Sequence, residues 1–262
     1  MKIRIQESVQ MRTIDSFWQE ERDIPPDSGF DLFGIEHILA MVIIALFIAA
    51  VVIWFRKSKD KDRLIIIRVI AALLPILEAW KIVMLIMSDR MDIGHLPLHL
   101  CSMAIYIYPV VAYLPEGKLR ETLAEISVIT LLPAGISAIV FPDWTMYPIM
   151  NFYCLHAFVW HALQVVFPIL CVMNGRCFPR IRNLWKNTLF LVCCGALVGV
   201  FDWKMSCNYW FLNSPVDGTP LEWLYDTFGT KGYIVSLLGL ATMVNIVAYG
   251  VCKGVCRRCK KC

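Results

Sequence analysis

The sequence predicts an all-α membrane protein, built as a bundle of seven transmembrane helices. Its hydrophobic fraction is 58% and its charged fraction 18%, whereas soluble domains average roughly 45–50% and about 25%. The mean hydropathy is +0.62. The apolar residues are gathered into segments of about 20, the length that crosses the hydrocarbon core of a bilayer. The net charge of +4 is therefore interpreted through its distribution between the spans, and no nucleic-acid partner is expected.

The chain begins with a polar segment in which Phe17 and Trp18 indicate a position at the membrane interface. Two prolines, Pro25 and Pro26, stop any helix before the first span. No cleavable signal peptide is expected, because this segment has charges throughout and no apolar core followed by small residues. We expect three parts: an interfacial segment (1–30), a transmembrane domain (31–251) and a cytoplasmic tail rich in Cys, Lys and Arg (252–262).

Polar loops separate the first three predicted spans. The first, about residues 35–55, ends at a basic loop, and the second, about 64–87, ends at a short polar loop. The third, about 96–114, opens with Pro97, because proline suits the first helical position, where its missing N–H costs nothing. It ends at Pro115.

Four further spans complete the predicted bundle. The fourth, about 122–141, ends at Pro142, and the fifth, about 148–173, is followed by a loop with four basic residues. The sixth is about 188–203. The seventh, about 232–251, leads into the tail.

The position of Lys and Arg predicts the orientation. These residues concentrate after spans one, three, five and seven, and they resist translocation. The N-terminus is therefore expected outside and the C-terminus in the cytoplasm of a cell-membrane protein. With a rise of about 1.5 Å per residue, ionisable residues from five segments then fall in the outer half of the bilayer: Glu36, His37, Glu78, Lys81, His95, His99, Cys101, His156, Asp202 and Lys204.

Two histidines and a cysteine, His95, His99 and Cys101, open the third span. These side chains can transfer protons, bind metal or attack a carbonyl, and lipid is a costly place to keep them without a function. If the helix begins at Pro97, its N-terminus favours the thiolate of Cys101. His99 is turned about 200° away from Cys101 on an ideal helix, so we expect the base to come from another helix.

His156 lies at the matching depth in the fifth span. We therefore predict a nucleophile–base pair, Cys101 and His156, divided between two helices. Glu78 or Asp202 is expected to orient the imidazole. His161 is turned about 500° from His156, so only one of the two is expected in the site.

Structural roles stay open for the other members of this cluster. His37, at a helix start, fits an interfacial or helix-end interaction. Glu78 and Lys81 are three residues apart, which suits an intrahelical ion pair. Asp202 is near the interface, where snorkelling is cheap.

The longest outer loop, residues 202–215, is rich in aromatic and turn-forming residues. It fits an interfacial aromatic belt. It also fits a lid over the outer cluster, in which Asn208 and Tyr209 bind a substrate head group.

Cysteine and histidine also raise the question of a metal. The four tail cysteines lie among basic residues, which favours S-acylation or contact with anionic lipid over a four-thiolate site. A site on His95, His99 and His156 is a second option. We predict no metal and no cofactor.

Four short motifs carry a resemblance to known proteins. They are Phe33-Gly-Ile-Glu-His37, Leu96-Pro-Leu-His-Leu-Cys101, His156 in span five, and Asn208-Tyr-Trp-Phe-Leu212 with Pro215. In this order they resemble the YwaF family of bacterial integral membrane proteins, over about residues 33–250. That family is in turn similar to a eukaryotic transmembrane acyltransferase family that makes polyunsaturated ether phospholipids. There a cysteine in span three and a histidine in span five are the proposed catalytic pair, which implies these roles for Cys101 and His156.

We therefore expect a lipid acyltransferase with a thioester intermediate. His156 takes the proton of Cys101, the thiolate attacks an acyl ester or thioester, and a lysophospholipid hydroxyl accepts the acyl group. Backbone N–H groups at the start of span three are expected to stabilise the oxyanion. Membrane lipids are the expected partners. The alternatives are a small-molecule or ion transporter, a receptor, and a metal-dependent hydrolase.

Overall fold

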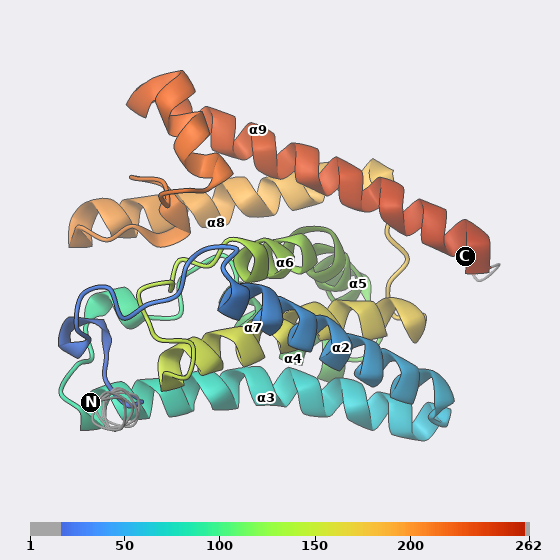
Figure 1. Ribbon diagram of the computed structural model, residues 1–262. Helices are drawn as coiled ribbons and strands as arrows, with labels where there is room; N and C mark the ends of the chain where they lie inside the picture. The colour runs from blue at the N-terminus through green and yellow to red at the C-terminus, as the bar shows by residue number, and fades with distance from the viewer. Residues whose placement is uncertain (1–16, 260–262) are drawn as a thin grey trace.

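The computed structural model describes residues 17–259 and shows a bundle of helices (Figure 1). The described residues contain no β-strand, which confirms the all-α prediction. In chain order the main elements are α2 (Ile35–Lys57), α3 (Asp60–Met87), α4 (Met103–Tyr113), α5 (Lys118–Ile126), a π-helical turn (Ser127–Leu131), α6 (Leu132–Val140), α7 (Phe152–Met173), α8 (Leu184–Met205) and α9 (Pro220–Cys259).

In the part of the chain that the structure describes, six helical segments are long and apolar enough to cross a membrane. Five of them are α2, α3, α7, α8 and α9, and the sixth is the continuous run of α5, the π-helical turn and α6, from Lys118 to Val140. The chain is therefore a multi-pass membrane protein. Which side each end faces stays a prediction.

The predicted third span is shorter than expected. α4 covers only Met103–Tyr113, about 16 Å of rise against the ~30 Å of a hydrocarbon core. Residues 96–102 form turns instead of helix, after a single 3-10 turn, η2 (Ile93–His95). The full-length third span was therefore wrong, and its first seven residues belong to a folded connection.

The helices form two groups (Figure 1). In one group α7 is central and packs against α2, α3 and α6, while α4 packs against α3. In the other, α8 and α9 pair with each other and lie along one side of the bundle. α7 is apolar almost all round and mostly buried, as a helix enclosed by its neighbours must be.

A buried hydrogen-bond chain ties the two groups together. Thr130 of the π-helical turn donates to Asn187 of α8 at 3.0 Å. Asn187 in turn donates to the hydroxyl of Tyr249 in α9 at 2.9 Å, and that hydroxyl donates to Glu125 at 2.9 Å. Because each group has a partner, these polar side chains are tolerated in an apolar interior.

Glycine permits two backbone features. α9 is kinked at Gly229, which has φ 64° and ψ 176°, a conformation that only glycine adopts without strain. Gly29 lies where an added Cβ would approach the Thr145 carbonyl oxygen to 2.1 Å. The N-terminal segment can therefore lie close against the loop that follows α6.

That N-terminal segment, in its described part, docks onto the loops at the end of the bundle that is predicted to face outward. The backbone N–H of Phe30 donates to Thr145 at 3.0 Å, and that of Phe152 donates to Phe17 at 2.7 Å. Arg90, after α3, binds both carboxylate oxygens of Asp23 at 2.6 Å. The segment thus forms part of the walls around the site described below.

Candidate functional site

A large cavity lies between the two groups of helices. It has a volume of about 1060 Å³, at the upper end of the range of ligand pockets. Side chains of α3, α6, α7, α8 and α9 line it, together with the connection before α4 and the loop after α8. Four residues predicted from the sequence are among them: Glu78, His99, Cys101 and His156.

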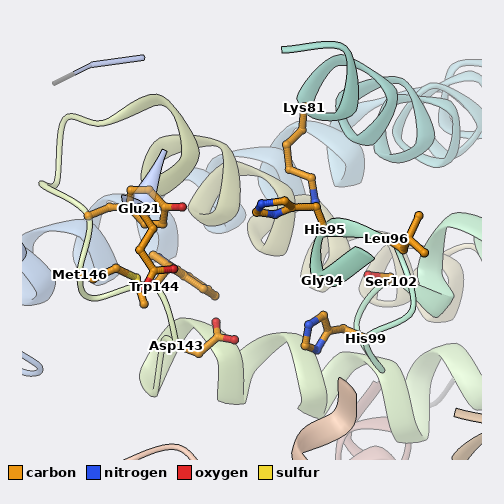
Figure 2. A pocket seen from close by; sticks show the side chains of 11 residues that line it. Glu21, Lys81, Gly94, His95, Leu96, His99, Ser102, Asp143, Trp144 and Met146 are labelled. Atoms are coloured by element: carbon orange, nitrogen blue, oxygen red, sulfur yellow. The ribbon is translucent and has the colours of Figure 1, made fainter. Parts of the chain in front are cut away.

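The cavity is mainly apolar, and a polar pocket of about 230 Å³ adjoins it. We call this pocket the polar mouth; Figure 2 shows its lining side chains. His95 and Glu21 line the mouth without reaching the cavity. Five residues line both spaces: Lys81, His99, Ser102, Asp143 and Trp144. The combination provides a charged entrance above an apolar chamber.

His99 is held by aromatic neighbours from the loop after α8. The ring of Tyr209 packs edge-on against it at 4.7 Å between ring centroids, and Phe211 lies at 5.8 Å. Burial, with a smaller contribution from the ammonium of Lys81, lowers the pKa of His99 to about 4. The imidazole is therefore neutral at pH 7 and able to accept a hydrogen bond.

This lowered pKa predicts a pH-dependent stability. The unfolded chain protonates His99 near pH 6.5 and the folded chain only near pH 4. Between these values the unfolded state therefore binds more protons, and stability falls as the pH falls. Between pH 6.5 and pH 4 the free energy of unfolding of the wild type should therefore fall. We expect this fall to be smaller by roughly 2–3 kcal/mol in His99→Asn. The measurement is the free energy of unfolding of both proteins in detergent at pH 7, 5.5 and 4. The same pH dependence in the wild type and in His99→Asn would contradict a lowered pKa of His99.

Asp143 also lines the polar mouth, and it was not among the site residues predicted from the sequence. It follows α6, and its side chain reaches the cavity and the mouth. Burial raises the pKa of its carboxyl group from the ordinary value. Its place directly after the fourth predicted span was a usable signal, because it set the residue at the depth of the other outer groups.

Cys101 lies two residues before α4, not beyond its first turn as predicted. It packs partly buried against the main hydrophobic core, in contact with the side chain of Gln164 from α7. The N–H groups of Met103, Ala104 and Ile105 donate to carbonyl groups of the preceding turn. The N–H groups at the start of α4 are therefore already occupied, and oxyanion stabilisation by N–H groups earlier in this connection stays a prediction.

Both histidines of α7 line the cavity, although only one was expected there. Nε2 of His156 donates to the Leu77 carbonyl at 3.0 Å, which leaves Nδ1 as the acceptor. Nδ1 of His161 donates to the Ala157 carbonyl at 2.7 Å, which leaves Nε2 as the acceptor. Trp144 stacks on the His161 ring at 4.9 Å. Each imidazole thus has one nitrogen able to take a proton.

The contact between Cys101 and Gln164 indicates the depth of the thiol along α7. His161 is three residues from Gln164, about 4.5 Å along the axis, whereas His156 is eight residues away, about 12 Å. His161 and Gln164 also share a face of the helix. The sequence alone indicates His156, because it does not show the contact that favours His161.

A backbone carbonyl, and not a carboxylate, orients His156. Glu78 is buried and forms an ion pair with Lys81 at 2.7 Å, as the intrahelical alternative predicted. Asp202 is buried near the end of α8 and is not part of the cavity wall. Neither carboxylate is the acceptor that His156 Nε2 uses in the structure, and an orienting role for Glu78 or Asp202 stays a prediction.

His37 has a structural role. Its side chain is completely buried, Nδ1 accepts from the Phe33 N–H at 3.0 Å, and Nε2 donates to the Ile139 carbonyl at 2.9 Å. Both ring nitrogens are therefore used by the protein itself. The ring links the start of α2 to the end of α6.

The loop after α8 covers the connection before α4 through a short helix, η5 (Tyr209–Phe211). Tyr209 donates to the Ile93 carbonyl at 2.6 Å, and Trp210 donates to Leu98 at 2.8 Å. Asn208 bonds to Ser214 within the loop. Asn208 and Tyr209 are absent from the cavity wall, whereas Trp210 forms part of it. Contact of Asn208 and Tyr209 with a head group therefore stays a prediction.

Metal ligands are not grouped in the described part of the chain. Within residues 17–254, whose side chains the structure describes, no three His, Cys, Asp or Glu side chains lie together as a metal site requires. This includes His95, His99 and His156, so their predicted alternative as a triad of ligands is not supported. Of the four tail cysteines, Cys262 and the side chains of Cys256 and Cys259 lie outside the described part of the chain.

Comparison with known proteins gives one match. The model of the TMEM164 family matches residues 32–249, which include every residue of the cavity wall. No curated protein and no solved structure matches the chain. The resemblance to the YwaF family remains a prediction.

Proposed function

Because the chain belongs to the TMEM164 family, which is an ether-lipid acyltransferase family, we propose that it is a membrane-embedded acyltransferase acting on phospholipids. The observation that carries this proposal is the apolar cavity with a polar mouth, on whose wall a thiol and three imidazoles lie. Lipids combine an apolar chain with a charged head group, and the two spaces match these parts. Soluble substrates would not need so large an apolar chamber.

The substrate is proposed to bind with its acyl chain in the cavity and its phosphate in the mouth. Lys81 provides a positive charge there, and its partner Glu78 is buried. His95 and His99 provide further hydrogen-bonding nitrogens at the same rim. In this pose the ester at the base of the head group is placed near the mouth end of the cavity, toward Cys101.

The proposed reaction has two halves. A histidine of α7 takes the proton from the Cys101 thiol, and the thiolate attacks the ester carbonyl of the donor phospholipid. The ester C–O bond breaks, the protonated histidine returns its proton to the departing lysophospholipid oxygen, and a Cys101 thioester remains. The hydroxyl of an acceptor lysophospholipid then attacks the thioester, loses its proton to the histidine, and the thiol is regenerated.

The identity of the base rests on two different arguments. His156 is the residue that the resemblance implies. His161 is favoured by its depth beside Gln164, which the Cys101 side chain contacts, and by its free Nε2. We propose His161 as the base, with His156 as the alternative, and both are tested by the variants considered in the Discussion.

Acyl transfer by the purified protein tests the proposed function. Detergent-solubilised protein is mixed with a phospholipid carrying a deuterated acyl chain and an unlabelled lysophospholipid, and the products are identified by mass spectrometry. The proposal predicts a labelled diacyl product from the acceptor. Labelled free fatty acid alone would indicate a hydrolase, and the absence of both products would refute the proposed chemistry.

A further inference from the structure

Three arginines lie together at the end of the bundle opposite the polar mouth. They come from α3 (Arg68), the first turn of α5 (Arg120) and the loop after α7 (Arg176). Arg68 is 13 residues from Lys81 on the same helix, about 20 Å along the axis, so this arginine cluster is separate from the cavity. None of the three lines the cavity or the mouth.

The three guanidinium groups converge on the end of α4. The Arg68 guanidinium lies 5.5 Å from the ring centroid of Tyr113. Arg176 donates to the Val111 carbonyl at 3.1 Å. Arg120 pairs with Glu116, directly after α4, at 3.2 Å. Three segments of chain thus bring like charges to the end of a fourth, α4.

The positive charge of this cluster is not balanced by the described protein. Among residues 17–259, Glu116 forms the ion pair with the cluster, and its side chain is 88% exposed, so water weakens the attraction. Burial and the neighbouring charges of Arg120 and Arg68 lower the pKa of Arg176. Holding three like charges together is unfavourable unless an anion joins them.

Hydrogen-bond donors without acceptors in the cluster also indicate a missing anion. Nε of each of the three arginines is buried and has no hydrogen-bond acceptor within the described residues. Arg120 as a whole is only 8% exposed. A buried N–H without an acceptor is unfavourable, and a charged one more so. The cluster therefore offers several donors and lacks the acceptor that they require.

We propose that the arginine cluster binds a phosphate group, supplied by an anionic lipid head group or by a soluble phosphate. Planar guanidinium groups bind phosphate oxygens in pairs, and three of them can surround one tetrahedral anion. Exposed basic residues from the last turn of α2 to the start of α3, such as Arg56 and Lys59, make the same end of the bundle basic (Figure 1) and attract anions to it. The site is independent of the proposed acyl transfer.

The test measures the thermal midpoint of the purified full-length protein in detergent. The probes are phosphatidylglycerol, sodium phosphate, and sodium chloride of the same ionic strength. At saturation we expect a probe that binds to raise the wild-type midpoint by about 5 °C. Arg176→Gln and Arg120→Gln should lose this rise, with at least a tenfold weaker apparent Kd. Arg182→Gln removes an exposed charge from the same loop and should keep it.

The outcomes separate the sources and the alternatives. A rise with phosphatidylglycerol alone identifies a lipid head group, and a rise with sodium phosphate identifies a soluble anion. Without a probe, Arg176→Gln should be at least as stable as wild type, because a like charge has been removed; if it does not fold, Arg68→Gln takes its place. Equal midpoints in all three solutions, or an equal loss of the rise in Arg182→Gln, would overturn the proposal.

Discussion

Replacing Cys101 by alanine should abolish acyl transfer and leave the fold intact. If the thiol forms the thioester, no other group in the cavity supplies an equivalent nucleophile. Losses of about a thousandfold or more in kcat are typical when a nucleophile is removed. The stability effect should be small, because the side chain is only partly buried and alanine removes one sulfur atom.

The matched control for this variant is Cys194→Ala. Cys194 is also partly buried, lies on α8, and does not line the cavity. Its replacement should leave kcat within about twofold of wild type, as expected for a surface-facing or packing cysteine. If Cys101→Ala keeps the activity of Cys194→Ala, the thiol is not the nucleophile.

The second large effect is expected at His161. Asparagine in its place keeps a donor near the Ala157 carbonyl, which Nδ1 of His161 bonds in the native protein, but it removes the basic nitrogen. We expect His161→Asn to lower kcat by about 10²–10⁴, the usual contribution of general acid–base catalysis. The measurement is single-turnover acyl transfer at pH 7, because it reports the chemical step.

His156→Gln is the matched variant on the same helix. Glutamine keeps a donor near the Leu77 carbonyl, which Nε2 of His156 bonds. If His161 is the base, this variant should lose no more than about tenfold, through altered packing at the cavity wall. The reverse order of effects would assign the base to His156, and full activity in both variants would remove histidine from the mechanism.

The fold was largely predictable from the sequence, because the lengths of apolar segments follow from bilayer thickness. Five of the seven predicted spans agree with the six long segments to within a few residues at most ends, and the seventh, about 232–251, lies inside the longer helix α9. The third span was the exception. Nothing in the residues from 96 to 102 distinguishes a helix from turns, since it is Trp210 and Tyr209, more than 100 positions away, that hold this connection.

The site was predictable in depth but not in contacts. Depth along the spans brought Cys101, His99, Glu78 and His156 to one cavity. Depth alone did not separate His37 from these residues, and the helix-start interaction expected as its structural role is present, with both nitrogens bonded to Phe33 and Ile139.

The choice between the two α7 histidines also depended on tertiary structure. Helix periodicity separated His156 from His161 and suggested that only one would reach the site. A cavity of about 1060 Å³ admits both, because the α7 residues that line it follow the i, i+3, i+4, i+7, i+8 spacing of one broad helix face. Gln164, which sequence reasoning left out, provides the depth marker through its contact with Cys101.

The proposed thioester is tested most directly by measuring the mass of the Cys101 peptide after brief mixing of purified protein with an acyl-labelled phospholipid. We expect one labelled acyl group on this peptide, in a bond that neutral hydroxylamine cleaves and that is lost when a lysophospholipid is added. Transfer of label to the lysophospholipid with Cys101 unmodified at every time point would contradict it.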